Sequence, residues 1–336
     1  MTIPSTMRAV QLSAYDGKPD SISVAEIPMP HVGPGKVLIK VHASPINPSD
    51  LMFVQGQYGF KKPLPAVPGF EGSGVVVESG SGMIARYLKG RRVACATADP
   101  GIASGTWAEY AVTSANLCVP LQDHVSLEQG ATLLVNPMTA WAMLEMTRNG
   151  RHRALVQTAA ASSLGRMVVR LGKRFSTPVI SVVRRAEQVE LLHDIGAEHV
   201  LDSSDPAFAD RLRELCRQLG ASIGFDAVAG ELTAIVMRAQ PRGSRMLLYG
   251  GLSLLPARAD AASLIFEDKR LEGFWLSAWL RSKNMLSLLR LGNHVQALLA
   301  GDLKTEVHAK APLGDAVAAM QKYAADMTAG KVLLMP

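Results

Sequence analysis

The sequence is poor in cysteine and tryptophan and has no long apolar run, and these shortages exclude several classes of protein. Its three cysteines, Cys95, Cys118 and Cys216, lie 23 and 98 residues apart (118 − 95 and 216 − 118) and form no CxxC pair. This spacing excludes a zinc finger, an iron–sulfur site and a disulfide framework, and it favours a reducing compartment. No apolar run reaches the roughly 18 residues of a transmembrane helix, so we expect no membrane contact.

The charge of the chain is modest and scattered. A net charge of +6, no Lys/Arg-rich block and only four tryptophans argue against nucleic-acid binding and fit a solvated basic surface with an anionic small ligand. Residues 1–10 resemble neither a signal peptide nor a transit peptide, so we expect a cytoplasmic protein. A chain of 336 residues, 48% of them hydrophobic, suits about two domains.

The first 125 residues are predicted to be rich in β-structure. Short apolar or alternating runs are separated by proline and glycine, and five prolines between Pro45 and Pro68 indicate turns rather than helices in that stretch. The expected strands are 7–13, 36–43, 74–77, 92–95, 107–112 and 117–120.

From residue 126 the pattern changes to alternating helices and strands. A helical segment over 126–147 is interrupted at Asn136-Pro137, and an i, i+3, i+4, i+7 apolar face begins at Leu164. The other helices are expected at 186–195, 206–219 and from about 280 to 299, with strands at 154–157, 178–183, 199–201, 223–228, 245–249 and 271–276. This alternation predicts an α/β fold with a Rossmann-type doubly wound parallel sheet.

The last segment returns to mixed character and is too short to fold alone. It contains strand-like residues 307–309 and 331–335 around a helix near 316–324. We therefore expect residues 1–125 and 300–336 to form one domain and residues 126–299, which hold the parallel sheet, to form the other.

A turn of small residues follows the first strand of the predicted sheet. Residues 158–165 read Thr-Ala-Ala-Ala-Ser-Ser-Leu-Gly and lead into an amphipathic helix. Small side chains let the backbone approach a pyrophosphate, and the N–H groups of the helix N-terminus bind it. Only Gly165 remains of a GxGxxG pattern, so a tight turn without a ligand is the alternative.

Two arginines follow the next strand. Arg184 lies 19 residues after Gly165 (184 − 165), where an NAD site places a carboxylate on the ribose. Guanidinium groups there bind a 2′-phosphate instead, so we predict NADPH as cofactor. The alternative is that Arg184 and Arg185 begin a solvated helix. Tyr249-Gly250-Gly251 comes after a later strand and leaves room for a cofactor, although a plain turn would also explain it.

Several motifs along the chain resemble those of one enzyme family. They are Pro45-Ile-Asn-Pro-Ser-Asp50, Gln55-Gly-Gln-Tyr-Gly59, Leu64-Pro-Ala-Val-Pro-Gly-Phe-Glu-Gly72, Gly105-Thr-Trp-Ala-Glu-Tyr110, Val135-Asn-Pro-Met-Thr-Ala140, Leu264-Ile-Phe-Glu-Asp268 and Gly273-Phe-Trp-Leu-Ser277. The chain resembles a medium-chain dehydrogenase/reductase, with a GroES-like catalytic domain beside the Rossmann-type one. Within that group it is most similar to 2-enoyl thioester reductases and close to quinone oxidoreductases.

The residues that would ligate zinc in related enzymes are missing here. The stretch from Ser44 to Asp50 has no cysteine, Phe70 stands where a Gly-His-Glu motif has histidine, and residues 99–105 replace a four-cysteine lobe. We therefore expect no metal. Without a Lewis acid, hydride transfer to an activated C=C is more favourable than reduction of a plain aldehyde.

The resemblance implies that Tyr58 is the proton donor. A phenol with a pKa near 10 holds its proton at neutral pH and can donate it to a developing enolate. The alternative is a loop tyrosine that packs its ring on a neighbour. Asp50 and Glu71 lie close to the lost zinc site and could relay protons, or could hold loops by hydrogen bonds.

The resemblance also implies a set of cofactor contacts. They are Asn136 on the nicotinamide side, Ala161, Ser162, Ser163 and Leu164 around the pyrophosphate, Arg184 and Arg185 at the 2′-phosphate, and then Tyr249, Gly250, Gly251, Leu252, Phe274, Trp275, Leu276, Ser277 and Lys331. Phe274 and Trp275 could instead be core or subunit-interface residues, because strand 271–276 is apolar enough for burial against a second subunit. We expect a homodimer.

These observations predict NADPH-dependent, zinc-independent reduction of a 2-enoyl thioester on CoA or acyl carrier protein. The alternatives are an NADPH:quinone oxidoreductase and a non-catalytic NADPH-binding protein. Lys269, Arg270, Arg281 and Lys283 form a basic group that could attract an anionic thioester, or could be ordinary solvated charge.

Overall fold

The computed structural model describes residues 3–336, apart from the Met285 side chain, and the chain divides into two compact units. The first unit contains Met1–Val135 and Lys304–Pro336, and the second contains Asn136–Leu303. The boundaries lie 10 and 4 residues beyond the predicted ones (135 − 125 and 303 − 299). The first difference arises because α3 (Leu127–Ala131) contacts β3, β4 and β5 and so stays with the first unit.

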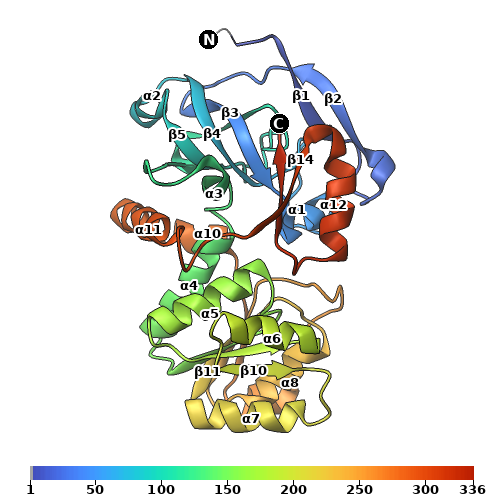
Figure 1. The fold of residues 1–336 in the computed structure, drawn as a ribbon, viewed down its shortest axis with the longest axis vertical. Coiled ribbons are helices and arrows are strands. Elements are labelled where there is room, and N and C mark those ends of the chain that lie inside the picture. Colours follow the sequence, from blue (N-terminus) through green and yellow to red (C-terminus); the bar gives the residue numbers. More distant parts are fainter. Residues whose placement is uncertain (1–2) are drawn as a thin grey trace. The chain divides into compact units, whose positions relative to one another are not determined.

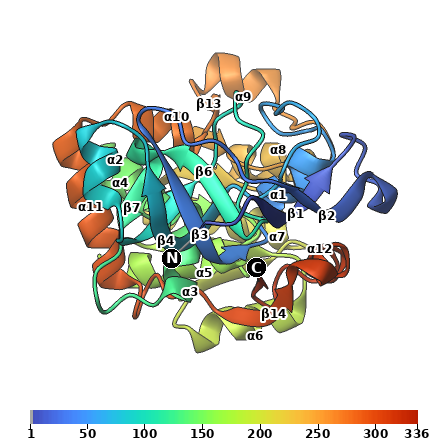
Figure 2. The ribbon, with the colours of Figure 1, turned by 90° about the horizontal axis from the view of Figure 1, so that it is seen from above.

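The first unit is built on a mostly antiparallel sheet that the C-terminal segment completes with the parallel pair β14 and β15. Its strands are β3 (Lys36–Pro45), β4 (Glu71–Ser79), β5 (Arg92–Ala96), β6 (Tyr110–Ser114), β7 (Cys118–Pro120), β14 (Val307–Pro312) and β15 (Lys331–Met335). The order is β14-β15-β3-β4-β5-β7, with β6 also paired to β3, as Figure 2 shows for β3, β4 and β6. β1 (Thr6–Leu12) and β2 (Ile22–Pro28), which was not predicted, form a separate hairpin.

The proline-rich stretch contains a helix where turns were expected. α1 (Pro48–Val54) begins at Pro48, because the fixed φ of proline suits the first helical position and its missing N–H is not needed there. Asn47 and Asp50 complete a capping box. α2 (Met83–Leu88) was also not predicted, and α12 (Ala316–Ala325) packs against α1 in the core of this unit (Figure 1).

One expected strand of the first unit is shifted. The apolar run 107–112 forms β6 only from Tyr110 onward, because Trp107 is fully buried in the core and Ala108 makes just an isolated bridge to Ala9.

The second unit is a doubly wound parallel sheet, as predicted. Its strands are β8 (Ala154–Gln157), β9 (Val179–Val183), β10 (His199–Asp202), β11 (Ala221–Asp226), β12 (Arg245–Leu248) and β13 (Arg270–Gly273), in the order β10-β9-β8-β11-β12-β13. α5 (Ser163–Arg174) and α6 (Ala186–Asp194) share an apolar cluster on one face of the sheet, and α7 (Phe208–Leu219) and α8 (Glu231–Ala239) share another on the opposite face (Figure 1).

The remaining helices of this unit correct one prediction. α4 (Asn136–Asn149) begins where the break at Asn136-Pro137 was expected, and α9 (Ala261–Phe266), α10 (Leu276–Arg281) and α11 (Met285–Leu298) follow the last strands. The strand predicted over 271–276 ends at Gly273, and Leu276 begins α10. The reason is that β13 is a half-exposed edge strand with β12 as its only partner among the described residues. No described helix is both long and apolar enough to cross a bilayer.

Candidate active site

Most of the predicted cofactor residues of the second unit follow the carboxyl ends of its strands. The 158–165 turn follows β8, Arg184 and Arg185 follow β9, Tyr249 follows β12, and Phe274 follows β13. The strands are parallel, so these positions lie along one edge of the sheet. The chain order reverses between β8 and β11 at the centre of that edge, which is where open α/β sheets bind ligands.

The turn after β8 has the shape that a pyrophosphate requires. Ser162 caps α5 by accepting a hydrogen bond from the Gly165 N–H at 3.1 Å. A Cβ on Gly165 would lie 2.3 Å from the Ala160 carbonyl oxygen, so the close turn requires glycine there. Ala159 adopts φ +50, a conformation that non-glycine residues rarely hold outside functional turns. The small side chains leave the helix N-terminus open to an anion.

A buried hydroxyl in this turn supports an anionic ligand. The Ser163 side chain is 8% exposed, and its Oγ atom has no hydrogen-bond partner among the described residues. Ala161 and Leu164 are buried beside it. A buried hydroxyl without a partner is costly, so an oxygen-rich group bound at this helix start would restore the missing hydrogen bond. The residues present therefore fit the phosphates of a dinucleotide.

Asp226 connects several segments at the carboxyl edge of the parallel sheet. The sequence analysis did not single it out. Its fully buried carboxylate accepts hydrogen bonds from the Thr158 and Thr233 hydroxyls, each at 2.6 Å, and from the Val228 N–H at 2.8 Å. It thus joins the turn after β8 to the end of β11 and to α8. The only signal in the sequence is a carboxylate at the end of an apolar strand.

The two arginines after β9 differ in what their side chains do. The Arg185 Nε lies 2.8 Å from Glu187 Oε1 and the residue caps α6. Arg184 is exposed, and its backbone N–H donates to Gln188 Oε1 at 3.1 Å. No hydrogen bond or ion pair engages the Arg184 guanidinium within residues 3–336. Arg184 is therefore the better placed of the two to bind a phosphate.

The later predicted contacts are placed as follows. The Tyr249 N–H donates to Asp226 O at 2.9 Å, and a Cβ on Gly250 would lie 2.9 Å from the Ala227 carbonyl oxygen. Gly251 and the exposed Leu252 continue this turn. Phe274 is buried, Trp275 is 42% exposed and caps α10, and Leu276 and Ser277 open that helix. Asn136 is the first residue of α4 and is buried.

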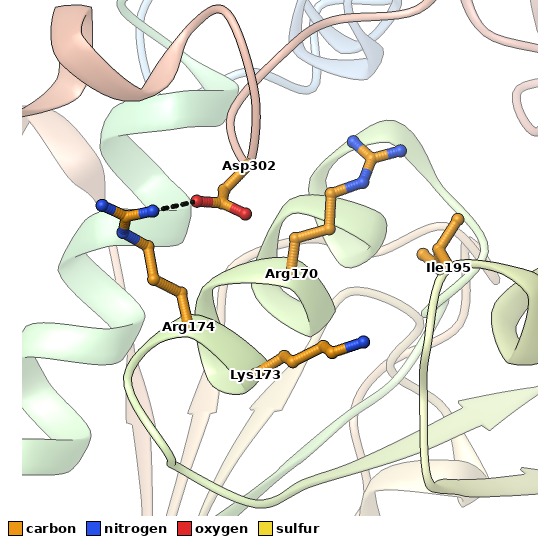
Figure 3. A pocket seen from close by; sticks show the side chains of 5 residues that line it. All are labelled: Arg170, Lys173, Arg174, Ile195 and Asp302. Carbon is orange, nitrogen blue, oxygen red and sulfur yellow. Dashed lines mark hydrogen bonds and ion pairs between the residues drawn. The ribbon is translucent and has the colours of Figure 1, made fainter.

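A basic pocket lies elsewhere on the second unit. Arg170, Lys173, Arg174, Ile195 and Asp302 surround a volume of about 480 Å³, and the Arg174 guanidinium lies 3.2 Å from Asp302 (Figure 3). Its cations come from the C-terminal half of α5, and none of the predicted cofactor residues lines it. The candidate site is therefore the carboxyl edge of the sheet and not this pocket.

Most of the basic side chains expected to form a group around residues 269–283 already have partners within the second unit. Lys269 is buried, donates to the Met237 carbonyl oxygen at 2.7 Å and pairs with Glu267 at the same distance. Lys283 pairs with Glu145, and Arg281 stacks on Trp275 with its Cζ 5.0 Å from the ring centroid. The sequence could not show that these charges already have partners.

In the first unit, Tyr58 lies in a cluster of aromatic rings. Its ring centroid is 4.5 Å from that of Phe70 and 5.2 Å from that of Phe60. The ammonium group of the buried Lys62 lies 5.7 Å from the Phe70 ring centroid and donates to the Ser104 carbonyl oxygen at 2.7 Å. The ring packing that was the alternative role of Tyr58 is thus present, and it leaves the role of the hydroxyl open to test.

A buried polar network surrounds Glu71 and Asp50, the two carboxyls that the sequence singled out as proton relays or loop anchors. Glu71 Oε1 accepts from the Asn47 side-chain amide, and its Oε2 accepts from the Leu134 and Val135 N–H groups, all at 2.9 Å. Asp50 accepts from the Asn47 N–H at 2.8 Å and from the Phe70 N–H at 3.0 Å. Both carboxyls therefore hold backbone segments in place.

Lys331 is also part of this network. Its ammonium group donates to Asn47 Oδ1, to the Ile46 carbonyl oxygen at 3.2 Å and to the Tyr323 hydroxyl at 3.1 Å. The side chain is 1% exposed. These hydrogen bonds within the first unit compensate for the burial of the ammonium charge. The cofactor contact expected of Lys331 stays a prediction.

Burial sets the charge state of the two carboxyls. It raises the pKa of Asp50 and of Glu71 to about 7 each, against the lowering effects of their hydrogen bonds and of Lys331. In the unfolded chain both ionise near pH 4. Between these values the folded state binds more protons than the unfolded state, so the free energy of unfolding should fall as the pH rises from about 5 to about 8.

Glu71→Gln should flatten this fall. The variant removes one of the two groups that take up protons on folding, whatever its effect on stability at a single pH. Urea unfolding at several pH values between 5 and 8 measures the slope. Glu109→Gln changes a half-buried partner of Arg8 whose pKa is lowered, so that this carboxyl is ionised throughout this pH range, and the variant should keep the wild-type slope. An unchanged slope in Glu71→Gln would contradict the interpretation.

Comparison with known proteins agrees with both units. Residues 33–123 match the alcohol dehydrogenase GroES-like domain, and residues 163–290 match the zinc-binding dehydrogenase domain. The chain is 30% identical over 340 residues to a mitochondrial enoyl-[acyl-carrier-protein] reductase of Bos taurus, covering 98% of this chain and 89% of that protein. The enzyme of the same name from Arabidopsis thaliana is 34% identical over 270 residues, covering 79% and 71%.

Solved structures show the same similarity. A protein of Mesorhizobium loti, provisionally named an NADPH:quinone reductase, is 38% identical with a TM-score of 0.92, and the match covers 100% of both chains. A mycobacterial protein solved in complex with NADPH is 26% identical with a TM-score of 0.83, covering 98% of this chain and 100% of that one.

A GroES-like domain joined to a Rossmann-type domain defines a dehydrogenase or reductase, and therefore an oxidoreductase. The chain belongs to the medium-chain dehydrogenase/reductase family, as its motifs predicted. Among the residues that the structure describes, no group of three or more His, Cys, Asp or Glu side chains is arranged so that it could hold a metal ion.

Proposed function

We propose that the protein reduces the activated C=C of a trans-2-enoyl thioester, carried by CoA or acyl carrier protein, with NADPH and without zinc. The observation that carries the proposal is the similarity over 98% of the chain to an enoyl-[acyl-carrier-protein] reductase. The open turn before α5, with its buried Ser163 hydroxyl, and the unpaired Arg184 guanidinium support the cofactor.

The residues of the chain would divide the work as follows. NADPH, when bound, supplies a hydride to the β-carbon of the alkene. Ser162, Ser163 and the N–H groups of α5 would hold its pyrophosphate, and Arg184 its 2′-phosphate. Tyr58 would donate a proton to the α-carbon, and its aromatic neighbours Phe60 and Phe70 would fix the orientation of the phenol.

A quinone substrate is the second candidate. It is favoured by the 38% identity to the Mesorhizobium loti protein named as a quinone reductase. Reduction of a quinone needs no dedicated proton donor, because the hydroquinone anion takes protons from water. The two candidates therefore differ in how much they depend on the hydroxyl of Tyr58.

A substrate panel tests the proposal. The rate of NADPH consumption is measured with a series of trans-2-enoyl-CoA thioesters, an enoyl thioester of acyl carrier protein and a benzoquinone, and NADH is tested in parallel. We expect the highest kcat/KM with an enoyl thioester and NADPH. A higher value with the quinone would favour the second candidate. NADPH binding without consumption on any substrate would indicate a non-catalytic protein.

We also propose that the protein is a homodimer joined at the β13 edge of the second unit. β13 is the last strand of the sheet, and exposed apolar side chains accompany it, among them Ile265 at 69%, Phe266 at 70% and Trp275 at 42%. An open strand edge beside an apolar patch can pair with a second copy and bury both.

Charge in this patch should separate the subunits. Phe266→Asp is expected to reduce the mass measured by light scattering from about twice 35.9 kDa to the monomer value. Met83→Asp, at a residue of α2 that is 84% exposed in the other unit, should leave the mass unchanged. A wild-type protein that is monomeric at micromolar concentration would end the proposal.

A further inference from the structure

Two of the three cysteines face each other across neighbouring strands. Cys95 of β5 is the direct register partner of Cys118 of β7, in an antiparallel pair that also joins Ala94 to Val119 and Val93 to Pro120. β7 lies at one edge of the sheet in the first unit. The 23 residues between the cysteines in the sequence concealed this pairing.

The hydrogen-bond pattern determines how close the two residues come. The Leu121 N–H donates to the Arg92 carbonyl oxygen at 2.9 Å, which makes these two residues a hydrogen-bonded pair one step before Val93 and Pro120. Hydrogen-bonded and non-hydrogen-bonded pairs alternate along an antiparallel ladder. Cys95 and Cys118 are therefore a non-hydrogen-bonded pair, whose Cα atoms lie about 4.5 Å apart. That separation is within the range of about 4.4–6.8 Å that a disulfide spans.

The two side chains also point to the same side of the sheet. Directly opposed residues do so in any antiparallel pair, and both cysteines belong to one apolar cluster with Val37, Ala85 and Leu88. Neither cysteine is in a disulfide. The two thiols are close enough for Cys95 to contribute to the raised pKa of Cys118. The Cys118 thiol donates to the Ser114 carbonyl oxygen, with the Sγ atom 3.7 Å away.

We propose that Cys95 and Cys118 are a redox-modification site, which a hydroperoxide converts into a cross-strand disulfide between β5 and β7. The site is independent of the reduction proposed above. Cys95 pairs with Gly72 on its other side, next to Glu71, so the bridge would form beside the polar network of the first unit.

The reaction has two balanced steps. The Cys118 thiolate attacks the peroxide, the O–O bond breaks, and Cys118 sulfenic acid and an alcohol or water are formed. Cys95 then loses its proton, attacks the sulfenic sulfur and displaces water, so that the S–S bond forms. The two thiols give up two electrons, and the hydroperoxide accepts them. A dithiol reductant reverses the change by thiol–disulfide exchange.

The surroundings of the thiols determine which one reacts first. Cys95 is 0% exposed, whereas Cys118 is 9% exposed and lies in a three-residue edge strand that can open locally. Burial raises the pKa of both thiols, so little thiolate is present at neutral pH and the first step should be slow. Cys216, in α7 of the second unit, is fully buried and has no cysteine opposite it in the described chain.

The test treats the full-length protein with hydrogen peroxide and then counts thiols after unfolding under conditions that block exchange. We expect the count to fall from three to one, with a Cys95–Cys118 linked peptide that lacks two hydrogen atoms, and to return to three with a dithiol reductant. Cys216→Ser should form the same bridge. Oxidation that consumes Cys216 first, joins separate chains, or yields only sulfinic acid would overturn the proposal.

Single variants test the order of reaction and guard against misfolding. In Cys95→Ser, peroxide should leave a Cys118 sulfenic acid that a 1,3-diketone traps. In Cys118→Ser, Cys95 should keep its thiol under the same treatment. Circular dichroism of both variants before oxidation checks that they fold. Trapping at Cys95 in the second variant, or no trapping at Cys118 in the first, would contradict the assignment of Cys118 as the residue that reacts first.

Discussion

Tyr58→Phe is expected to lower kcat for a trans-2-enoyl thioester by about 10²- to 10⁴-fold, the range for loss of a positioned proton donor. The dissociation constant of NADPH should stay nearly unchanged, since the contacts proposed for the cofactor come from other residues. The substitution keeps the ring that packs 4.5 Å from Phe70 and 5.2 Å from Phe60, so the loss can be assigned to the hydroxyl. Single-turnover kinetics and a fluorescence titration with NADPH provide the two measurements.

Comparison of Tyr58→Phe with Tyr58→Ala separates proton donation by the hydroxyl from packing of the ring. If Tyr58 only packs, phenylalanine should have no effect and Tyr58→Ala should destabilise the fold. Tyr87→Phe is the matched control, because Tyr87 is 58% exposed on α2 and stacks on Arg91 away from the aromatic cluster. A full loss with the enoyl thioester and normal turnover of a quinone would also show that the protein uses the hydroxyl for one substrate class alone.

Arg184→Ala should weaken the use of NADPH by about 30-fold in kcat/KM. Loss of one charge-assisted contact to a phosphate is worth about 2 kcal/mol, which corresponds to that factor. NADH lacks the 2′-phosphate, so its kcat/KM should change by less than about threefold. Steady-state kinetics with both cofactors, at one enoyl thioester concentration and fixed ionic strength, measure the difference.

Two further arginine variants make this experiment specific. Arg185→Ala should have a smaller effect on NADPH, because the Arg185 guanidinium is already paired with Glu187 at 2.8 Å. Arg213→Ala, on the exposed face of α7, should have none. Equal losses with NADPH and NADH would show that Arg184 supports the fold of the loop and does not bind the phosphate.

The regular part of the fold could be predicted because its patterns are local. Apolar runs of the length of one strand gave β8 and β15 at their observed bounds, and an i, i+3, i+4, i+7 face gave α5. The prediction of secondary structure failed where the place of a segment in the fold overrides its local sequence pattern. Proline density hid α1, because the first turn of a helix accepts proline, and the apolar run at 271–276 hid the start of α10, because an edge strand is short.

The candidate site could be predicted only in outline. Arg184 and the 158–165 turn follow from their spacing after two strands, and Tyr58 from a resemblance of short motifs. The partners of Asp226 could not be found, because they come from three segments between Thr158 and Thr233. The contacts of Lys331 with Asn47 join positions 284 residues apart (331 − 47).

The sequence by itself determined the two-domain α/β plan and the family, because these depend on residue identity, periodicity and spacing along the chain. The tertiary structure decided which groups meet. It placed Lys331 beside Asn47, brought Lys269 to the Met237 carbonyl oxygen and Lys283 to Glu145, and set Cys95 opposite Cys118. Strand register and burial produce these contacts, and both depend on segments that are distant in the chain.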